Sequence, residues 1–149
     1  MRRKDIYCNI AQFPVKYAIR ETPVNFRDLW GLSPVDSKTP NAPPRVSLDD
    51  HIYESQVLPF IVWLDNVRSG GDWDYKLIDL ELYENYGNFE YGATGRAQGL
   101  TEEELLRAAG LVQFAGSNYN LANGVPLGEA PYGDDPKDQG MIKLGIQYY

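Results

Sequence analysis

The residues with the clearest capacity for chemistry are acids that lie beside lysine, glycine and aromatic residues. The segment "DWDYK" places Asp72 and Asp74 on either side of Trp73, and Lys76 follows two positions later. A carboxylate beside a lysine can form a pair with perturbed pKa values, which suits acid–base catalysis. We therefore predict catalytic roles for Asp74 and Lys76, with Trp73 beside the substrate. The alternative is an ordinary ion pair at a turn, with Trp73 in the core.

The segment "ELYENYGNFEYGATG" is the strongest candidate for the catalytic centre. It contains three acids, Glu81, Glu84 and Glu90, among several aromatic residues. Apolar walls raise the pKa of a carboxyl group by desolvation, so it can stay protonated as a general acid near neutral pH. Glu84 is our first choice for this acid, and the alternative is a tight structural loop. Three neighbouring residues offer hydrogen bonds to a polar substrate: Asn88, Tyr91 and Thr94.

A further acidic group lies in "YGDDPKDQ". Asp135 directly precedes Pro136, which is the arrangement of a helix cap followed by the first helical residue. We predict that Asp134 is catalytic and that Asp138 binds substrate, both in the same cleft as Glu84. The alternatives are a cap alone or a site for a divalent cation.

Histidine and cysteine contribute little to this prediction. His51 is the only histidine, and it lies beside two acids at an expected helix start, where a solvated surface residue is the usual case. Cys8 is the only cysteine, so an intrachain disulfide is excluded. We predict no metal site and no cofactor, except a divalent cation in the nuclease alternative.

The charge of the chain is divided unevenly. Residues 1–32 carry six Lys/Arg and three Asp/Glu, whereas residues 33–149 carry eight and eighteen, a net charge of −10. Proteins that bind nucleic acids normally present a basic face, so this composition argues against a nucleic-acid partner. The longest apolar run, residues 57–64, is far shorter than the roughly 18 residues of a membrane span. We expect neither a membrane span nor a signal peptide.

The elements that must position these residues are mostly helical. We expect a helix from Ser47 or Asp49 to about residue 69, interrupted at Pro59. Thr101 and Glu104 form a capping box that opens a second helix, and a third begins at Pro136. Glycines predict a loop over residues 87–99. The predicted buried stripes are Ile52, Val57, Phe60, Ile61 and Leu64 in the first helix, and Leu105, Ala109 and Val112 in the second.

The fold class that follows is mainly α with long structured loops and a small β element. An α+β fold is the alternative, because "KLIDLELY" and the C-terminal segment are also compatible with strands. Residues 33–47 hold four prolines and read as an extended linker.

The segment "TPVNFRDLWGL" resembles the junction at the end of RHS-repeat shells, where a motif ending "D-P-x-G-L" separates the shell from a C-terminal toxin. The matching residues are Pro23, Asn25, Asp28, Gly31 and Leu32, and Leu29 stands where that family has proline. The resemblance implies a shell tail at residues 1–32, a Pro-rich linker at 33–49 and a toxin domain at 50–149. It also implies self-cleavage after Leu32 that depends on Asp28, and an RHS shell as partner.

Four blocks beyond this junction resemble the polymorphic toxin type 44 family: "GGDWDYK", "YENYGNFEYGATGRAQGL", "LLRAAGLVQ" and "PYGDDPKDQGMIKLGIQYY". This resemblance implies a secreted toxin of interbacterial competition, delivered into target cells and neutralised by a cognate immunity protein. It leaves the reaction open.

The carboxylate-rich segments narrowly favour a hydrolase that cleaves the glycosidic bonds of peptidoglycan, since a pair of Asp/Glu residues suffices for that reaction. The "G-x-x-x-Y-G-x-T-G" pattern is also loosely similar to lysozyme-like glycosidases. One alternative is a nuclease that uses Lys76, Arg96 and Arg107 to bind phosphate. Another is a non-enzymatic inhibitor of a cellular target.

Overall fold

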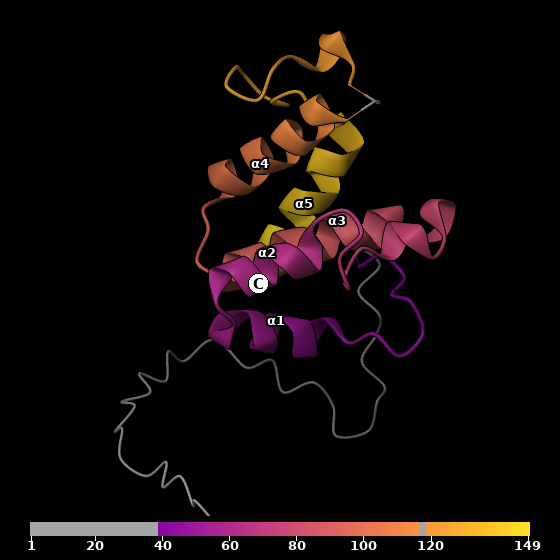
Figure 1. Ribbon diagram of the computed structural model, residues 1–149. Coiled ribbons are helices and arrows are strands. Elements are labelled where there is room, and N and C mark those ends of the chain that lie inside the picture. Colours follow the sequence, from indigo (N-terminus) through magenta and orange to yellow (C-terminus); the bar gives the residue numbers. More distant parts are fainter. Residues whose placement is uncertain (1–38, 117–118) are drawn as a thin grey trace, which may run out of the picture. The chain divides into compact units, whose positions relative to one another are not determined.

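Helix α3, Leu80–Ala97, is the central element of the domain (Figure 1). The computed structural model describes residues 39–116 and 119–149, so the predicted cleavage residues Asp28 and Leu32 lie outside the described part. The other elements are α1 Leu48–Val57, α2 Phe60–Val67, η1 Tyr75–Leu77, α4 Glu102–Ala115, η2 Leu121–Asn123 and α5 Pro136–Tyr148. The described ranges contain helices and no strand, which confirms the mainly α class, whereas the predicted small β element is not found in these ranges.

The helix starts agree with the local sequence signals. The Ser47 hydroxyl accepts a hydrogen bond from the Asp50 amide, and Pro59 separates α1 from α2. Thr101 and Glu104 form the predicted capping box of α4. The Asp135 carboxylate accepts from the Lys137 amide at the start of α5. These predictions are confirmed because each depends only on residues within one turn of the helix end.

The prediction of a loop over residues 87–99 is wrong for most of this range, because α3 continues without a break to Ala97 and only residues 98 and 99 form a turn. Gly92 of α3 and Gly145 of α5 allow these two helices to pack closely against each other. A Cβ atom at Gly145 of α5 would overlap the Phe89 carbonyl oxygen, and one at Gly92 would overlap the Ile142 carbonyl oxygen. The missing side chains let the backbones of α3 and α5 touch where the two helices cross (Figure 1).

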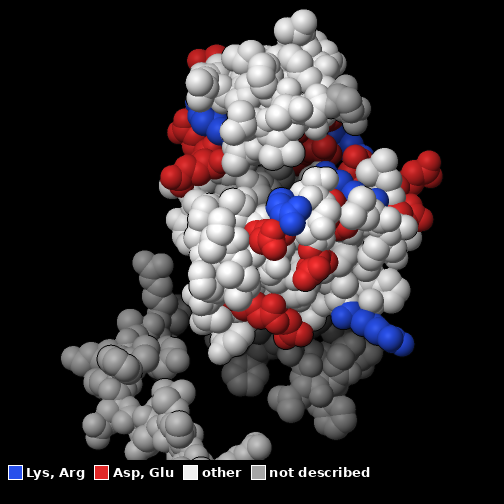
Figure 2. Space-filling model, viewed as in Figure 1, with Lys and Arg blue, Asp and Glu red and all other residues white. Residues whose placement is uncertain are grey.

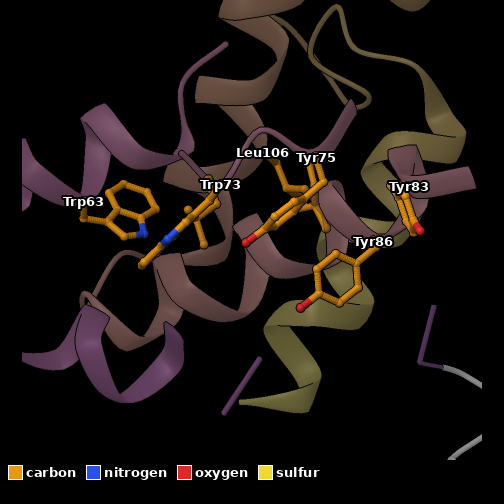
Figure 3. Packing of buried hydrophobic residues seen from close by; sticks show 8 residues of the cluster. Trp63, Trp73, Tyr75, Tyr83, Tyr86 and Leu106 are labelled. Carbon is orange, nitrogen blue, oxygen red and sulfur yellow. The ribbon is translucent and has the colours of Figure 1, made fainter. Parts of the chain in front are cut away.

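Aromatic residues form most of the core. Trp63, Trp73, Tyr75 and Tyr86 lie in one row, with Leu106 behind them (Figure 3). Trp63 is the residue of α2 that is buried, and its indole N–H donates to the Thr94 hydroxyl at 3.2 Å. The row joins the segment before α3 to α3 itself.

The predicted apolar stripe of the first helix is wrong in most of its positions. Val57, Phe60, Ile61 and Leu64 are exposed, and α2 turns Trp63 inward instead. In α4, Leu105 is buried as predicted, whereas Val112 is exposed. Among residues 39–116 and 119–149, these apolar side chains of α1, α2 and α4 therefore lie on the surface and not in the core.

The segment between α4 and α5 is an ordered loop over residues 119–135. Arg107 of α4 anchors it, since its guanidinium donates to the carbonyl oxygens of Pro126 at 2.8 Å and Gly128 at 3.1 Å. The same guanidinium lies 4.3 Å from the centre of the Tyr132 ring. This anchorage brings Asp134 to the start of α5. Among the described helices, none is long and apolar enough to cross a membrane.

Candidate functional site

A cleft of about 290 Å³ opens between the end of α2, η1 and the faces of α3, α4 and α5. Its walls include residues from three of the segments that the sequence singled out. Seven of the nine predicted catalytic and substrate-binding residues line it: Trp73, Asp74, Lys76, Asn88, Tyr91, Asp134 and Asp138. The other two, Glu84 and Thr94, are not in its walls.

Asp138 lies in the first turn of α5, and its half-buried side chain lines the cleft. Its carboxylate makes no hydrogen bond to any described residue. Loss of solvent raises the pKa of Asp138 to about 6; nearby Lys76 opposes this shift and the negative charge of Glu84 adds to it. A carboxyl group with such a pKa is partly protonated near neutral pH and can donate a proton.

Asp134 is more deeply buried and is held in place. One carboxylate oxygen accepts from the Gln139 side-chain amide at 2.8 Å, and the other accepts from the Asp135 backbone amide at 2.9 Å. Burial raises the pKa of Asp134, whereas these two hydrogen bonds and the positive charge of Lys76 lower it. The hydrogen bonds fix the orientation of the carboxylate at the cleft wall.

Lys76 supplies a positive charge to the cleft wall that acts on both acids. It belongs to η1, and its aliphatic chain runs beside Gly87 of α3. Its ammonium group makes no hydrogen bond or ion pair with the described residues, yet it lowers the pKa of both Asp134 and Asp138. The second cation in the cleft wall, Arg68, is paired at 2.6 Å with the exposed Asp65.

Asn88 and Tyr91 form the part of the cleft that belongs to α3. The side-chain NH₂ group of Asn88 is buried and has no hydrogen-bond partner among the described residues. Leaving such a donor unpaired costs free energy, which an acceptor on a ligand or a buried water molecule would offset. The Tyr91 hydroxyl already donates to the Leu105 carbonyl oxygen at 3.1 Å, so Tyr91 offers its ring more than its hydroxyl.

The remaining predicted residues have structural contacts. The Asp74 carboxylate accepts from the Gly70 amide at 2.9 Å and closes a turn. Thr94 is fully buried, where its hydroxyl accepts from Trp63 and donates to the Glu90 carbonyl oxygen at 2.8 Å. Glu84 forms an ion pair at 2.9 Å with Lys137 of α5. Its influence on the cleft is therefore electrostatic, through Asp138.

A second polar cluster lies on the α1 side of α3. His51 of α1 pairs through Nδ1 with one carboxylate oxygen of Glu90, which is 1% exposed. The imidazole also stacks on the indole of Trp73, with 4.3 Å between ring centres and 9° between planes. Burial raises the pKa of Glu90, and the hydrogen bond from His51 opposes this shift.

Residues 78–149 match the family model for bacterial toxin 44. No curated protein matches the chain, and no solved structure does.

The toxin 44 match supports a bacterial toxin domain in this part of the chain. It covers α3, α4 and α5, and with them the cleft residues Asn88, Tyr91, Asp134 and Asp138. Trp73, Asp74 and Lys76 lie just before its first residue. The match does not extend to the junction motif near residue 32.

The pairing of His51 with Glu90 was missed at the level of sequence. Tyr86, Glu90 and Thr94 recur at four-residue intervals, which is the spacing of one helix face. Reading residues 87–99 as a loop hid this periodicity.

In residues 39–116 and 119–149, no group of three or more His, Cys, Asp or Glu side chains is arranged to hold a metal ion.

Proposed function

We propose that this chain is an interbacterial toxin that hydrolyses glycosidic bonds of peptidoglycan, with Asp138 as the general acid. The observation that carries this proposal is the Asp138 carboxyl in the cleft wall. It is half-buried, it is free of hydrogen bonds to the described residues, and its pKa is raised to about 6. A carboxylic acid with this pKa can protonate a leaving oxygen near neutral pH.

Asp134 is the second carboxylate that this reaction requires. Glycosidases pair an acid with a carboxylate that either attacks the sugar or activates water, while positive charge develops on the ring. The hydrogen bonds from Gln139 and Asp135 hold Asp134 in one orientation, and Lys76 favours its ionised form. Asp138 gives its proton to the glycosidic oxygen, and water supplies the hydroxyl of the new reducing end and the proton that restores Asp138.

The cleft walls suit a sugar chain. Trp73 and Tyr91 offer aromatic surface, and Asn88 offers an unpaired donor for a hydroxyl or acetamido oxygen. Leu64, Val67 and Val112 supply apolar surface on the opposite side. An apolar wall with a few polar groups is the usual composition of a site for a small organic ligand.

A nuclease is the second candidate, because Lys76 and Arg68 both line the cleft and cations bind phosphate. The overall charge favours the glycosidase, because residues 33–149 carry eighteen Asp/Glu against eight Lys/Arg. On the face shown in Figure 2, groups of acidic side chains lie beside several Lys and Arg. A polyanionic substrate would approach against this field.

The test compares a peptidoglycan zymogram with RNA and DNA digestion gels, run with the same purified protein. We expect clearing of peptidoglycan that disappears in Asp138→Asn and persists in Glu129→Gln, a change at an exposed acid of the loop. Digestion of RNA or DNA without clearing would replace the glycosidase by the nuclease.

Delivery and partners belong to the same proposal. The toxin 44 match supports secretion into target cells and neutralisation by a cognate immunity protein. The RHS shell tail rests on the junction pattern alone, and we propose cleavage between Leu32 and Ser33. Mass spectrometry of the full shell protein should find the cut in wild type and an intact chain in Asp28→Asn, whereas equal cleavage in both would remove Asp28 from the mechanism.

A further inference from the structure

Trp73 belongs to the cleft wall but lies outside every helix. It sits in the connection between α2 and η1, where its backbone amide donates to the Asn66 carbonyl oxygen at 3.0 Å. A side chain on a connecting segment depends on its neighbours for a fixed position. The orientation of the Trp73 ring is therefore set by what its faces touch.

The ring that covers one face of the Trp73 indole is the imidazole of His51. The two rings are nearly parallel, and their centres are 4.3 Å apart. The imidazole continues the stack to Tyr75, at 6.5 Å and 5°. His51 is not itself in the cleft wall, so Trp73 separates it from the cleft.

Glu90 fixes the imidazole in turn. Its carboxylate pairs with Nδ1 of His51, and Glu90 lies in the middle of α3, the central helix. The other carboxylate oxygen, Oε2, is buried without a hydrogen-bond partner among the described residues. A half-satisfied buried carboxylate costs free energy that an apolar residue of similar size would not. The pairing with His51 is the side-chain contact of the Glu90 carboxylate that offsets part of this cost.

We propose that His51 and Glu90 are positioning residues that hold the Trp73 ring as a substrate-stacking wall of the cleft. The couple connects a residue on a loop to the central helix through one hydrogen bond and one ring stack. The ligand that would stack on the Trp73 ring is a pyranose ring, so this part of the inference rests on the proposed glycosidase function.

The position of the Trp73 ring can be tested without substrate. The chain contains three tryptophans, so a protein labelled with 5-fluorotryptophan gives three ¹⁹F resonances, and Trp73→Phe assigns one of them. We expect His51→Ala to shift and broaden the Trp73 resonance and to leave that of Trp63 in place. Glu90→Gln retains an acceptor for the imidazole and should give a Trp73 resonance like that of wild type, whereas Glu90→Ala should not. Glu81→Gln, an exposed acid on the same helix, is the control.

The effect on substrate is measured with the N-acetylglucosamine trimer and with peptidoglycan. Positioning predicts that His51→Ala raises KM about tenfold while kcat changes less than about threefold. A Trp73 resonance that is unchanged in His51→Ala would overturn the proposal. A loss of kcat at constant KM would also overturn it, because His51 would then act in the chemical step.

The two proposals fail separately. If wild-type protein cleaves no glycan, the glycosidase is wrong, and the ¹⁹F spectra still decide whether His51 and Glu90 position Trp73. If His51→Ala does not fold, Glu90→Ala and Glu90→Gln are compared instead. Identical Trp73 resonances in these two variants would then contradict the proposal.

Discussion

Glu90 and Asp138 are both carboxyl groups with raised pKa values, but the structure treats them differently. Glu90 is 1% exposed and is bonded to His51, so its chemistry is directed at another residue of the chain. Asp138 is half-buried at a cleft and bonded to no described residue, so its chemistry remains available to a ligand. A raised pKa alone does not assign a role to a carboxyl group, so its hydrogen-bond partners and its exposure to a cleft must be weighed with it.

Among the changes that distinguish the cleft around Asp138 from the cluster of His51 and Glu90, Asp138→Asn should have the largest effect. If Asp138 is the general acid, peptidoglycan hydrolysis should fall by about 10²–10⁴-fold, the usual contribution of general acid catalysis. At neutral pH the melting temperature should equal or exceed that of wild type, because the substitution removes no hydrogen bond to a described residue and removes a carboxylate whose ionisation costs stability. Rates and melts of Glu129→Gln provide the reference. A variant that keeps its rate would show that the cleft acid is not catalytic.

Gly145→Ala tests whether the contact of α3 with α5 sets the geometry of the cleft and of the cluster of His51 and Glu90. A Cβ at Gly145 meets the rigid Phe89 carbonyl, so we expect a loss of about 3 kcal/mol in the free energy of unfolding, as in overpacked cores. Gly140→Ala is the matched control on α5, since a Cβ there meets nothing within 4 Å. The control should gain up to about 1 kcal/mol from helix propensity. Equal stability of the two variants in urea unfolding would contradict the close packing.

The pH dependence of stability provides a smaller effect. The folded pKa of Asp138, about 6, lies above its ordinary value of 3.8, so the folded state binds the proton more tightly than the unfolded state. The stability from this proton is complete below about pH 4 and is lost as pH rises through 6. The change is on the order of 1–3 kcal/mol, reduced by partial exposure. Urea unfolding between pH 4 and 7 should therefore give a flatter profile for Asp138→Asn, and parallel profiles would refute the shift.

The smallest effects concern the charges around Asp138. Lys76→Met removes a cation and should raise the pKa of Asp138, whereas Glu84→Gln removes an anion and should lower it. We expect each shift to be about one pH unit or less. NMR titration of the Asp138 side-chain carboxyl carbon measures both. Shifts of the same sign would show that neither charge acts directly on this carboxyl.

The helix starts could be predicted from sequence because their causes are local. Ser47, Thr101 and Asp135 each bond to an amide within three residues, and the residue types announce those bonds. Helix α3 could not be predicted in full, because Gly92 is required by Ile142 of α5, 50 residues away. A single sequence shows the glycine but not the distant residue whose backbone packs against it.

The candidate site divides in the same way. Its residues were found by type, since acids beside aromatic residues and lysine are recognisable in the chain. Their roles could not be assigned that way. Glu84 and Asp138 look equivalent in sequence, and only the ion pair of Glu84 with Lys137 distinguishes them. A role for His51 cannot be assigned from sequence, because its partner, Glu90, is 39 residues away. The catalytic roles stay predictions.

Arg107 holds the loop before α5 through the carbonyl oxygens of Pro126 and Gly128. Every residue type presents the same carbonyl, so this attachment does not read the side chains of the loop. Leu121 and Leu127, which point into solvent, can be exchanged without loosening it. The loop can therefore diversify in sequence while its backbone stays attached to α4 and Asp134 keeps its place before α5.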